Sequence, residues 1–128
     1  MLEMEWISLK DSKQLEEIVA ESKERPVLIY KHSTRCNISR ATFDRLERNW
    51  NASAVGSIKR YFLDLISCRD ISNKIAEIFQ VEHHSPQILV ISEGKSVLDL
   101  SHYDIDFDKI KSVFEHCHAG KIDMTNRH

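Results

Sequence analysis

One cysteine stands between a segment with the composition of a buried strand and a segment with helical periodicity. Cys36 follows the apolar run 27–30 and precedes a stretch in which apolar residues recur at helical spacing. A helix N-terminus carries unpaired N–H groups and a partial positive charge, and both favour a thiolate placed beside them. The thiolate is the nucleophilic form of cysteine. The sequence therefore predicts that Cys36 is an activated, catalytic thiol.

The residues around Cys36 suit thiol–disulfide exchange by a single cysteine. Ser39 stands where a Cys-x-x-Cys enzyme has its second cysteine, so no disulfide can form within this motif. Ser39 also lies one helical turn from Cys36, where its hydroxyl is expected to donate a hydrogen bond to the thiolate. We expect His32 and Arg35 to add positive charge, which stabilises an attacking or leaving thiolate.

The other two cysteines lack such surroundings. Cys68 follows the end of a predicted strand with no motif around it, and Cys117 continues the apolar stripe of Ile110, Val113 and Phe114, which favours core packing. Three cysteines without framework spacing indicate free thiols in a reducing compartment. With no visible signal peptide and no apolar run of the roughly 18 residues that span a membrane, we expect a cytoplasmic protein.

Composition indicates one ordinary globular domain. The chain has 128 residues, of which 41% are hydrophobic and 30% are charged, so we expect a single domain over residues 1–120 and a C-terminal tail over 121–128. A net charge of −2 gives no reason to propose nucleic acid or a membrane surface as a partner. No metal site is predicted, because the clustered histidines lack metal-ligand spacing. These histidines are His83, His84, His116 and His118.

Strands and helices are expected to alternate along the chain. Apolar runs and turn signals predict strands over 5–10, 27–30, 61–66, 88–91 and 97–100. The last two strands form a hairpin, because residues 92–95 read as a tight turn. The order β-α-β-α-β-α-β-β-α predicts an α/β fold in which helices flank a central mixed β-sheet.

Capping residues and apolar spacing predict the helices. The N-caps are expected at Asp11 (with Gln14 completing a capping box), at Ser33 or Thr34, and at Asp70. The last helix is expected to stop at Gly120. The buried faces of the first three helices are predicted at Leu15, Ile18 and Val19; at Ile38, Phe43, Leu46 and Trp50; and at Ile71, Ile75, Ile78 and Phe79.

This order of elements resembles the thioredoxin fold. Thioredoxin-like proteins carry a cis-proline before the hairpin strand, facing the active cysteine, and Pro86 holds that place here. More narrowly, K-H-S-T-R-C at 31–36, I-S at 38–39 and H-S-P-Q at 84–87 resemble the monothiol bacilliredoxins, whose motif is similar to K-H-S-x-x-C-P-I-S. The chain departs from that motif at Asn37, where the family usually has proline.

The resemblance implies a thiol–disulfide oxidoreductase. Such a protein removes a low-molecular-weight thiol, bacillithiol in this family, from mixed disulfides on S-thiolated client proteins through Cys36. It binds no cofactor, and the small thiol is a co-substrate that regenerates the cysteine. Residues expected to bind substrate or support the site are His32, Thr34, Arg35, Asn37, Ser39, Ser85 and Pro86.

Three other functions remain open. The chain could be a dithiol reductase that uses Cys68 or Cys117 as the resolving cysteine, or a non-catalytic thioredoxin-like interaction module. A monothiol glutaredoxin also has one active cysteine, but residues 36–39 differ from its usual C-G-F-S motif at two positions. Reactivity of Cys36 separates an enzyme from an interaction module, and a disulfide in the oxidised protein identifies a dithiol enzyme.

Overall fold

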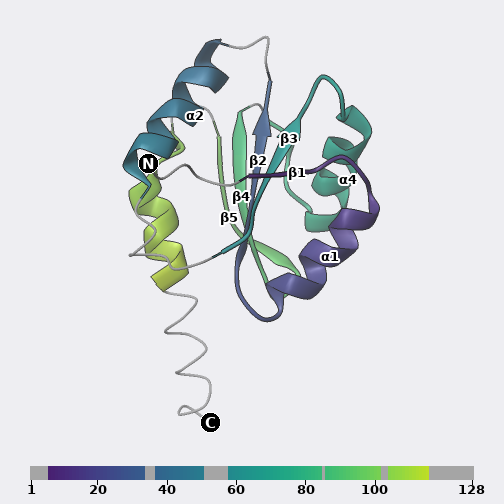
Figure 1. Ribbon diagram of the computed structural model, residues 1–128. Coiled ribbons are helices and arrows are strands. Elements are labelled where there is room, and N and C mark those ends of the chain that lie inside the picture. The colour runs from purple at the N-terminus through teal and green to yellow at the C-terminus, as the bar shows by residue number, and fades with distance from the viewer. Residues whose placement is uncertain (1–5, 34–36, 51–57, 85, 102–103, 116–128) are drawn as a thin grey trace.

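A computed structural model describes residues 6–33, 37–50, 58–84, 86–101 and 104–115. Within these residues, five strands form one mixed sheet in the order β1-β3-β2-β4-β5 (Figure 1). The strands are β1 (Ile7–Ser8), β2 (Val27–His32), β3 (Arg60–Asp64), β4 (Gln87–Ser92) and β5 (Lys95–Ser101). β1 and β2 run parallel to β3, whereas β4 is antiparallel to both β2 and β5. The predicted order of elements and the mixed sheet are confirmed.

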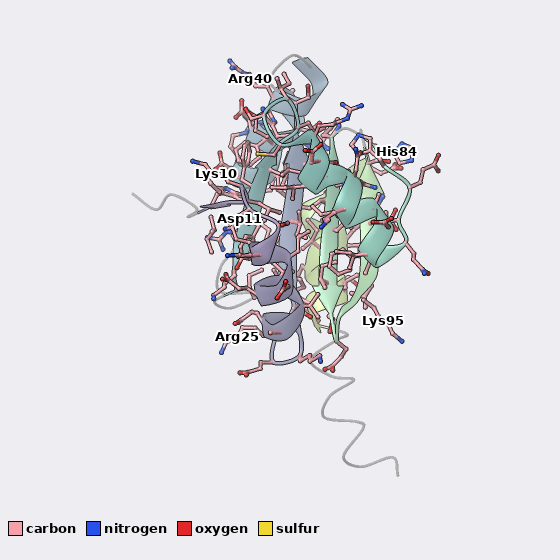
Figure 2. All side chains as sticks on the ribbon, turned by 90° about the vertical axis from the view of Figure 1, so that its right-hand side faces the viewer. Lys10, Asp11, Arg25, Arg40, His84 and Lys95 are labelled. Atoms are coloured by element: carbon pink, nitrogen blue, oxygen red, sulfur yellow. The ribbon has the colours of Figure 1, made fainter. Side chains whose placement is uncertain are left out.

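Helices cover both faces of the sheet in the described part of the chain. α1 (Lys13–Ser22) and α4 (Arg69–Phe79) lie on one face, and α2 (Asn37–Asn49) and a helix over residues 107–115 lie on the other (Figure 1). Figure 2 looks onto the face with α1 and α4. Parallel strands need long crossover connections, which helices supply here, whereas the antiparallel pair β4–β5 needs only a tight turn.

The two faces of β2 contribute to separate hydrophobic clusters. Val27 and Ile29 pack with buried residues of α1 and α4, while Leu28 and Tyr30 pack with buried residues of α2 and the 107–115 helix. Alternate residues of a strand point to opposite faces, so a central strand covered on both sides is apolar throughout. That pattern is why the run 27–30 could be recognised as a buried strand.

The boundaries of all five strands differ from the prediction. β4 and β5 are longer than the predicted spans 88–91 and 97–100, and the first three strands differ as follows. β1 has only two residues, Ile7–Ser8, instead of the predicted span 5–10. β2 continues to His32, two residues beyond its apolar run. β3 ends at Asp64 because the chain turns there: the side-chain Oδ1 of Asp64 accepts a hydrogen bond from the N–H of Ile66 at 3.1 Å.

The start of α1 agrees with the predicted capping pattern, although the assigned N-cap is Ser12. Oδ1 of Asp11 accepts a hydrogen bond from the N–H of Lys13, and Oε1 of Gln14 accepts one from the N–H of Asp11, both at 3.0 Å. Ser12 makes no side-chain capping bond. The reciprocal bonds of Asp11 and Gln14 therefore satisfy N–H groups at the helix start.

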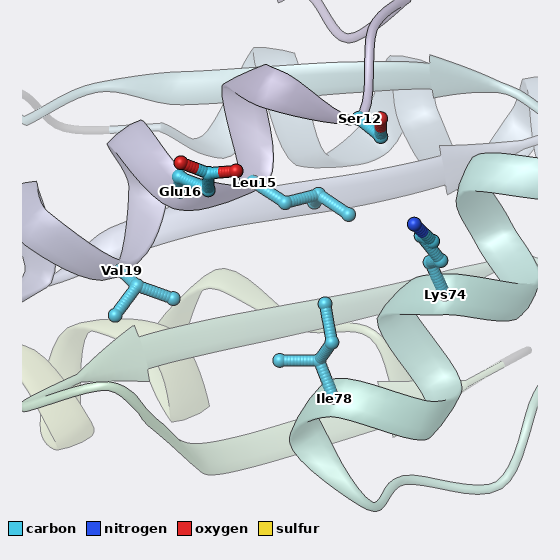
Figure 3. Close-up of a pocket in the computed structure, with 6 residues that line it drawn as sticks. All are labelled: Ser12, Leu15, Glu16, Val19, Lys74 and Ile78. Atoms are coloured by element: carbon cyan, nitrogen blue, oxygen red, sulfur yellow. The ribbon is translucent and has the colours of Figure 1, made fainter.

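Two predictions for α4 are wrong. Its N-cap is Cys68, and Asp70 instead lies in the first turn, where a carboxylate still interacts favourably with the helix dipole. Ile78 was expected to be buried but is 46% exposed. It lines an open groove between α1 and α4 instead of the core (Figure 3). The expected burial of Ile71, Ile75 and Phe79 is confirmed.

The predicted tight turn joins β4 to β5 and is attached to the end of α1. Glu93 and Gly94 have φ values of 54° and 75°, as both central residues of a type I′ hairpin turn require. The carbonyl oxygen of the buried Ser22 accepts a hydrogen bond from the N–H of Glu93, and its hydroxyl accepts one from the N–H of Gly94, both at 2.9 Å. The hairpin turn is thereby tied to α1.

In the last helix, Ile110 and Phe114 are buried and Val113 packs beside them, as predicted. Cys117, the predicted stop at Gly120 and the predicted tail 121–128 lie outside the described residues, so those expectations stay predictions.

Candidate functional site

Three strands meet at the edge of the sheet that leads to Cys36. His32, the last residue of β2, pairs with Asp64, the last residue of β3, and the carbonyl of His32 accepts a hydrogen bond from the N–H of Leu65 at 2.9 Å. β4 begins at this edge, where Gln87 pairs with Lys31. The described chain leaves this edge after Ser33 and resumes at the start of α2.

Cys36 itself lies outside the described residues, in the segment 34–36 between β2 and α2. Asn37 and Ser39 belong to the first turn of α2, although only their backbone is described. Ser85 lies outside the described residues as well, and so does the predicted cis bond between it and Pro86. Thr34 and Arg35 fall in the same undescribed segment as Cys36. The roles expected of all these residues stay predictions.

Pro86 is the second predicted site residue, besides His32, whose side chain the structure describes. It is buried and immediately precedes Gln87, the first residue of β4. Continuing the β2–β4 register by one residue beyond the pair of Lys31 and Gln87 sets Pro86 opposite His32. The structure therefore brings His32 and Pro86 to the same edge of the sheet.

His32 packs within an aromatic cluster. Its ring centroid lies 5.1 Å from that of Phe62, 5.9 Å from that of Phe43 and 6.2 Å from that of Tyr30, and only 7% of the residue is exposed. Burial lowers the pKa of His32 below its ordinary 6.5, with Asp64 acting in the opposite direction. This direction favours the neutral ring and speaks against the expected positive charge from His32.

The neighbouring Lys31 points to the opposite face of the sheet and is fully buried. Its Nζ lies 3.4 Å from the carbonyl oxygen of Ser72 and 3.4 Å from Nδ1 of His83, and the hydroxyl of Ser72 lies 3.1 Å from the same nitrogen. Desolvation by burial lowers the pKa of Lys31 to about 8. This cluster was not predicted from the sequence. The one local sign of it is that Lys31 directly follows four apolar strand residues.

Gln87 is also fully buried and holds the segment that leads to Pro86. Its Nε2 donates a hydrogen bond to the carbonyl of Glu82 at 2.9 Å, and its Oε1 accepts one from the N–H of His84 at 3.4 Å. The approach to Pro86 is therefore fixed by a side chain from the first position of β4.

Cys68 is held by backbone bonds on both sides. Its N–H donates to the carbonyl of Asp64 at 2.9 Å, and its carbonyl accepts from the N–H of Ser72 at 3.2 Å. It is partly buried against the core and lines a groove of about 250 Å³ together with Lys10 and Arg69. Cys68 lies after the end of β3, as predicted, and holds the N-cap position of α4 without a side-chain capping bond.

Other features of the described residues are distinct from this edge. The groove between α1 and α4 has a volume of about 320 Å³ and contains none of the predicted site residues (Figure 3). Within the described ranges, no group of three or more His, Cys, Asp or Glu side chains could hold a metal ion. No helix there is both long and apolar enough to cross a membrane.

Known proteins show the same fold. The family model described as monothiol bacilliredoxin BrxC matches residues 7–110. A solved structure with a thioredoxin fold, provisionally described as an oxidoreductase, is 29% identical, with a TM-score of 0.71 over 85% of this chain and 92% of that one. The thioredoxin of Malassezia sympodialis is 12% identical, with a TM-score of 0.68 over 91% and 94%. That of Fasciola hepatica is 18% identical, with a TM-score of 0.64 over 86% and 97%. The predicted thioredoxin-like fold is confirmed.

Proposed function

The chain belongs to the monothiol bacilliredoxin family, and from that premise we propose that it removes bacillithiol from mixed disulfides on oxidised client proteins through Cys36. Family and fold support a role in thiol redox chemistry. The observation that carries the proposal is the sheet edge where β2 ends and Pro86 precedes β4, because the segment with Cys36 leaves from that edge.

The proposed reaction needs one protein cysteine and two small thiols. The Cys36 thiolate attacks the bacillithiol sulfur of the mixed disulfide, and the client cysteine leaves as a thiolate that takes a proton from water. Cys36 then carries bacillithiol in a disulfide. A second bacillithiol, as its thiolate, attacks the sulfur of the bound one, which releases the Cys36 thiolate and the symmetric bacillithiol disulfide. Each exchange breaks one S–S bond and forms another, so the electrons balance.

The surrounding residues are proposed to bind and orient the reactants. Arg35 pairs with an anionic group of bacillithiol, and the hydroxyl of Ser39 donates to the thiolate. Ser85 offers its backbone to the client chain, as an edge strand does. His32 is proposed to line the site as a neutral ring packed among aromatic side chains, consistent with its burial and its lowered pKa.

The monothiol route is favoured over a dithiol route. Ser39 occupies the position of the usual second cysteine. The backbone of Cys68 is bonded to β3 and α4, and Cys68 has no sequence motif around it that would mark it as a resolving cysteine. The cytoplasm is the proposed compartment, since the three cysteines lack the spacing of a disulfide framework and structural disulfides are rare there. Nucleic acid and membrane lipid have no part in the proposed reaction.

Mild oxidation in the presence of bacillithiol tests the proposal. Peptide mapping by mass spectrometry should find one bacillithiol on Cys36, and alkylation without oxidant should modify Cys36 before the other two cysteines at neutral pH. Glutathione in place of bacillithiol is the control for the identity of the small thiol. A protein whose Cys36 neither reacts nor accepts the small thiol would be an interaction module, and a Cys36–Cys68 or Cys36–Cys117 disulfide would identify a dithiol enzyme.

A further inference from the structure

Two buried polar side chains on adjacent strands both reach the segment that precedes Pro86. Lys31 and Gln87 pair across β2 and β4, and neither is exposed. By strand alternation both side chains lie on the face that α1 and α4 cover, the face to which Ile29 and Leu89 contribute. Gln87 bonds to the backbone of residues 82 and 84, and Lys31 contacts the ring of His83.

Lys31 and His83 connect three separate parts of the chain. Lys31 lies in β2, Ser72 in α4 and His83 between α4 and β4. Nζ of Lys31 is 3.4 Å from the Ser72 carbonyl oxygen and from Nδ1 of His83, and the Ser72 hydroxyl is 3.1 Å from that Nδ1. Burying an ammonium group is costly unless polar partners surround it. Packing alone does not account for a lysine at this position, since a leucine or methionine would fill the same space at no such cost.

We propose that Lys31 and His83 are positioning residues that hold residues 80–84, and Pro86 with them, against the end of β2, and that proton uptake by His83 releases this hold. The part of the inference that concerns client binding rests on the proposed function. The coupling between Lys31 and His83 does not, because it is a property of the folded chain.

The hydrogen-bond roles at His83 explain why a proton would release the hold. Lys31 has only N–H donors, so its contact with Nδ1 requires the imidazole to be neutral, with its hydrogen on Nε2. In that tautomer the hydroxyl of Ser72, 3.1 Å from Nδ1, is also on the donor side of its contact. A solvent proton on Nδ1 of His83 removes the acceptor. It also leaves two positive charges, the imidazolium and the ammonium of Lys31, 3.4 Å apart if the contact is unchanged.

Burial and the neighbouring cations both favour the neutral form of His83. Burial is the main cause of its lowered pKa, followed by the cations Lys31 from β2 and Arg69 from α4, and then His84 from its own segment. His84 in turn lies 3.6 Å from the carboxylate of Glu82. Because the pKa of His83 is below its ordinary 6.5, the hold persists at neutral pH and is lost as the pH falls through the lowered value.

The first test follows the His83 ring by NMR as the pH is lowered. In the wild-type protein His83 should titrate below pH 6.5. Lys31→Met keeps the length of the side chain but removes its charge, so the pKa of His83 should rise in this variant. His84→Asn is the matched control on the same segment, and we expect a smaller change there. Unchanged titration of His83 in Lys31→Met would overturn the proposed coupling.

The second test measures the KM for an S-bacillithiolated client at pH 7.5 and pH 5.5, with the rate of Cys36 alkylation recorded in parallel as a measure of thiolate. The KM of the wild type should rise about fivefold on acidification beyond any change in the client alone, the size expected when one hydrogen bond is lost. His83→Asn keeps an acceptor that does not titrate, so its KM should stay low at both pH values. His83→Leu has no acceptor, so its KM should be high at both.

His84→Asn should retain the pH dependence of the wild type. The proposal is wrong if His83→Asn responds to acid as the wild type does. If the wild type reduces no client at all, the proposed function fails, and the NMR titration still decides whether Lys31 and His83 are coupled.

Discussion

His32 and Asp64 are the last residues of two parallel strands, and they lie directly in register. The chain segments that leave β2 and β3 therefore start side by side. One leads to Cys36 and the other to Cys68, four residues after each strand ends. Cys68 therefore lies on a segment that starts beside the one that leads to Cys36, and the first prediction tests whether Cys68 takes part in the reaction.

Removing both remote cysteines should leave the reaction nearly intact. The Cys68→Ser, Cys117→Ser double variant should reduce a bacillithiol mixed disulfide, with free bacillithiol present, at a rate close to that of the wild type, while Cys36→Ser should be inactive. Release of the reduced client is measured by mass spectrometry over time. Accumulation of the double variant with bacillithiol trapped on Cys36 would contradict the monothiol mechanism and identify a resolving cysteine.

Asn37→Pro restores the residue that is usual in the family and should be tolerated by the fold. Asn37 is the first residue of α2 as described, and proline is favoured in the first turn of a helix. We expect the free energy of unfolding to stay level or rise by about 0.4–1 kcal/mol. Loss of the N–H of residue 37 should slow attack by Cys36 about fivefold if that group donates to the thiolate.

Denaturant unfolding and stopped-flow exchange with a small disulfide measure these two effects of Asn37→Pro. A loss of about 3 kcal/mol would instead be the cost of proline within a helix interior, and would contradict the assigned helix start.

Stability should increase from pH 8 to pH 10 because of Lys31. Its pKa is lowered to about 8 in the folded protein from an ordinary 10.5. Between these values the unfolded chain binds the extra proton, so raising the pH favours the folded state. Lys31→Met should lack this increase and should be more stable than the wild type near pH 7. Urea unfolding under reducing conditions at several pH values measures both, and parallel curves for the two proteins would refute the lowered pKa.

Two isoleucines of α4 should differ sharply in their contribution to stability. Ile75 is fully buried and Ile78 is 46% exposed. Truncation to alanine should cost about 2–5 kcal/mol at Ile75, because it leaves a cavity. At Ile78 it should cost about 0.5 kcal/mol. Guanidinium unfolding of the two variants gives the comparison, and equal costs would show that the groove beside Ile78 is closed in solution.

Periodicity and turn chemistry were sufficient to predict the order of elements. The apolar run of β2 and the turn at residues 92–95 carry strong local signals, and the structure has both where they were expected. Ile78 was misjudged because its helical spacing fits a buried face, whereas burial depends on how far α1 and α4 are separated. That separation is a tertiary property which no local pattern encodes.

The polar part of the site was harder to predict for a similar reason. Lys31 and His83 are far apart in sequence, and each is an ordinary polar residue in its own segment. They meet only because β2 and β4 pair in one particular register. His32 was expected to add positive charge, but the aromatic rings of α2 and β3 pack against it and its burial lowers its pKa. Contacts with residues that are distant in the sequence therefore shift the pKa values of Lys31 and His32.

The two bonds from the β4–β5 hairpin turn to Ser22 make the amides of that turn a reporter of its contact with α1. Amides in a surface turn normally exchange with solvent within a short time, since local opening there is easy. The N–H groups of Glu93 and Gly94 are bonded to Ser22 at the end of α1, so they exchange when the turn and the end of α1 separate. Deuterium uptake at these two amides would therefore report the separation of the hairpin turn from the end of α1. A client or small thiol that loosens this contact would increase the uptake there, far along the chain from Cys36.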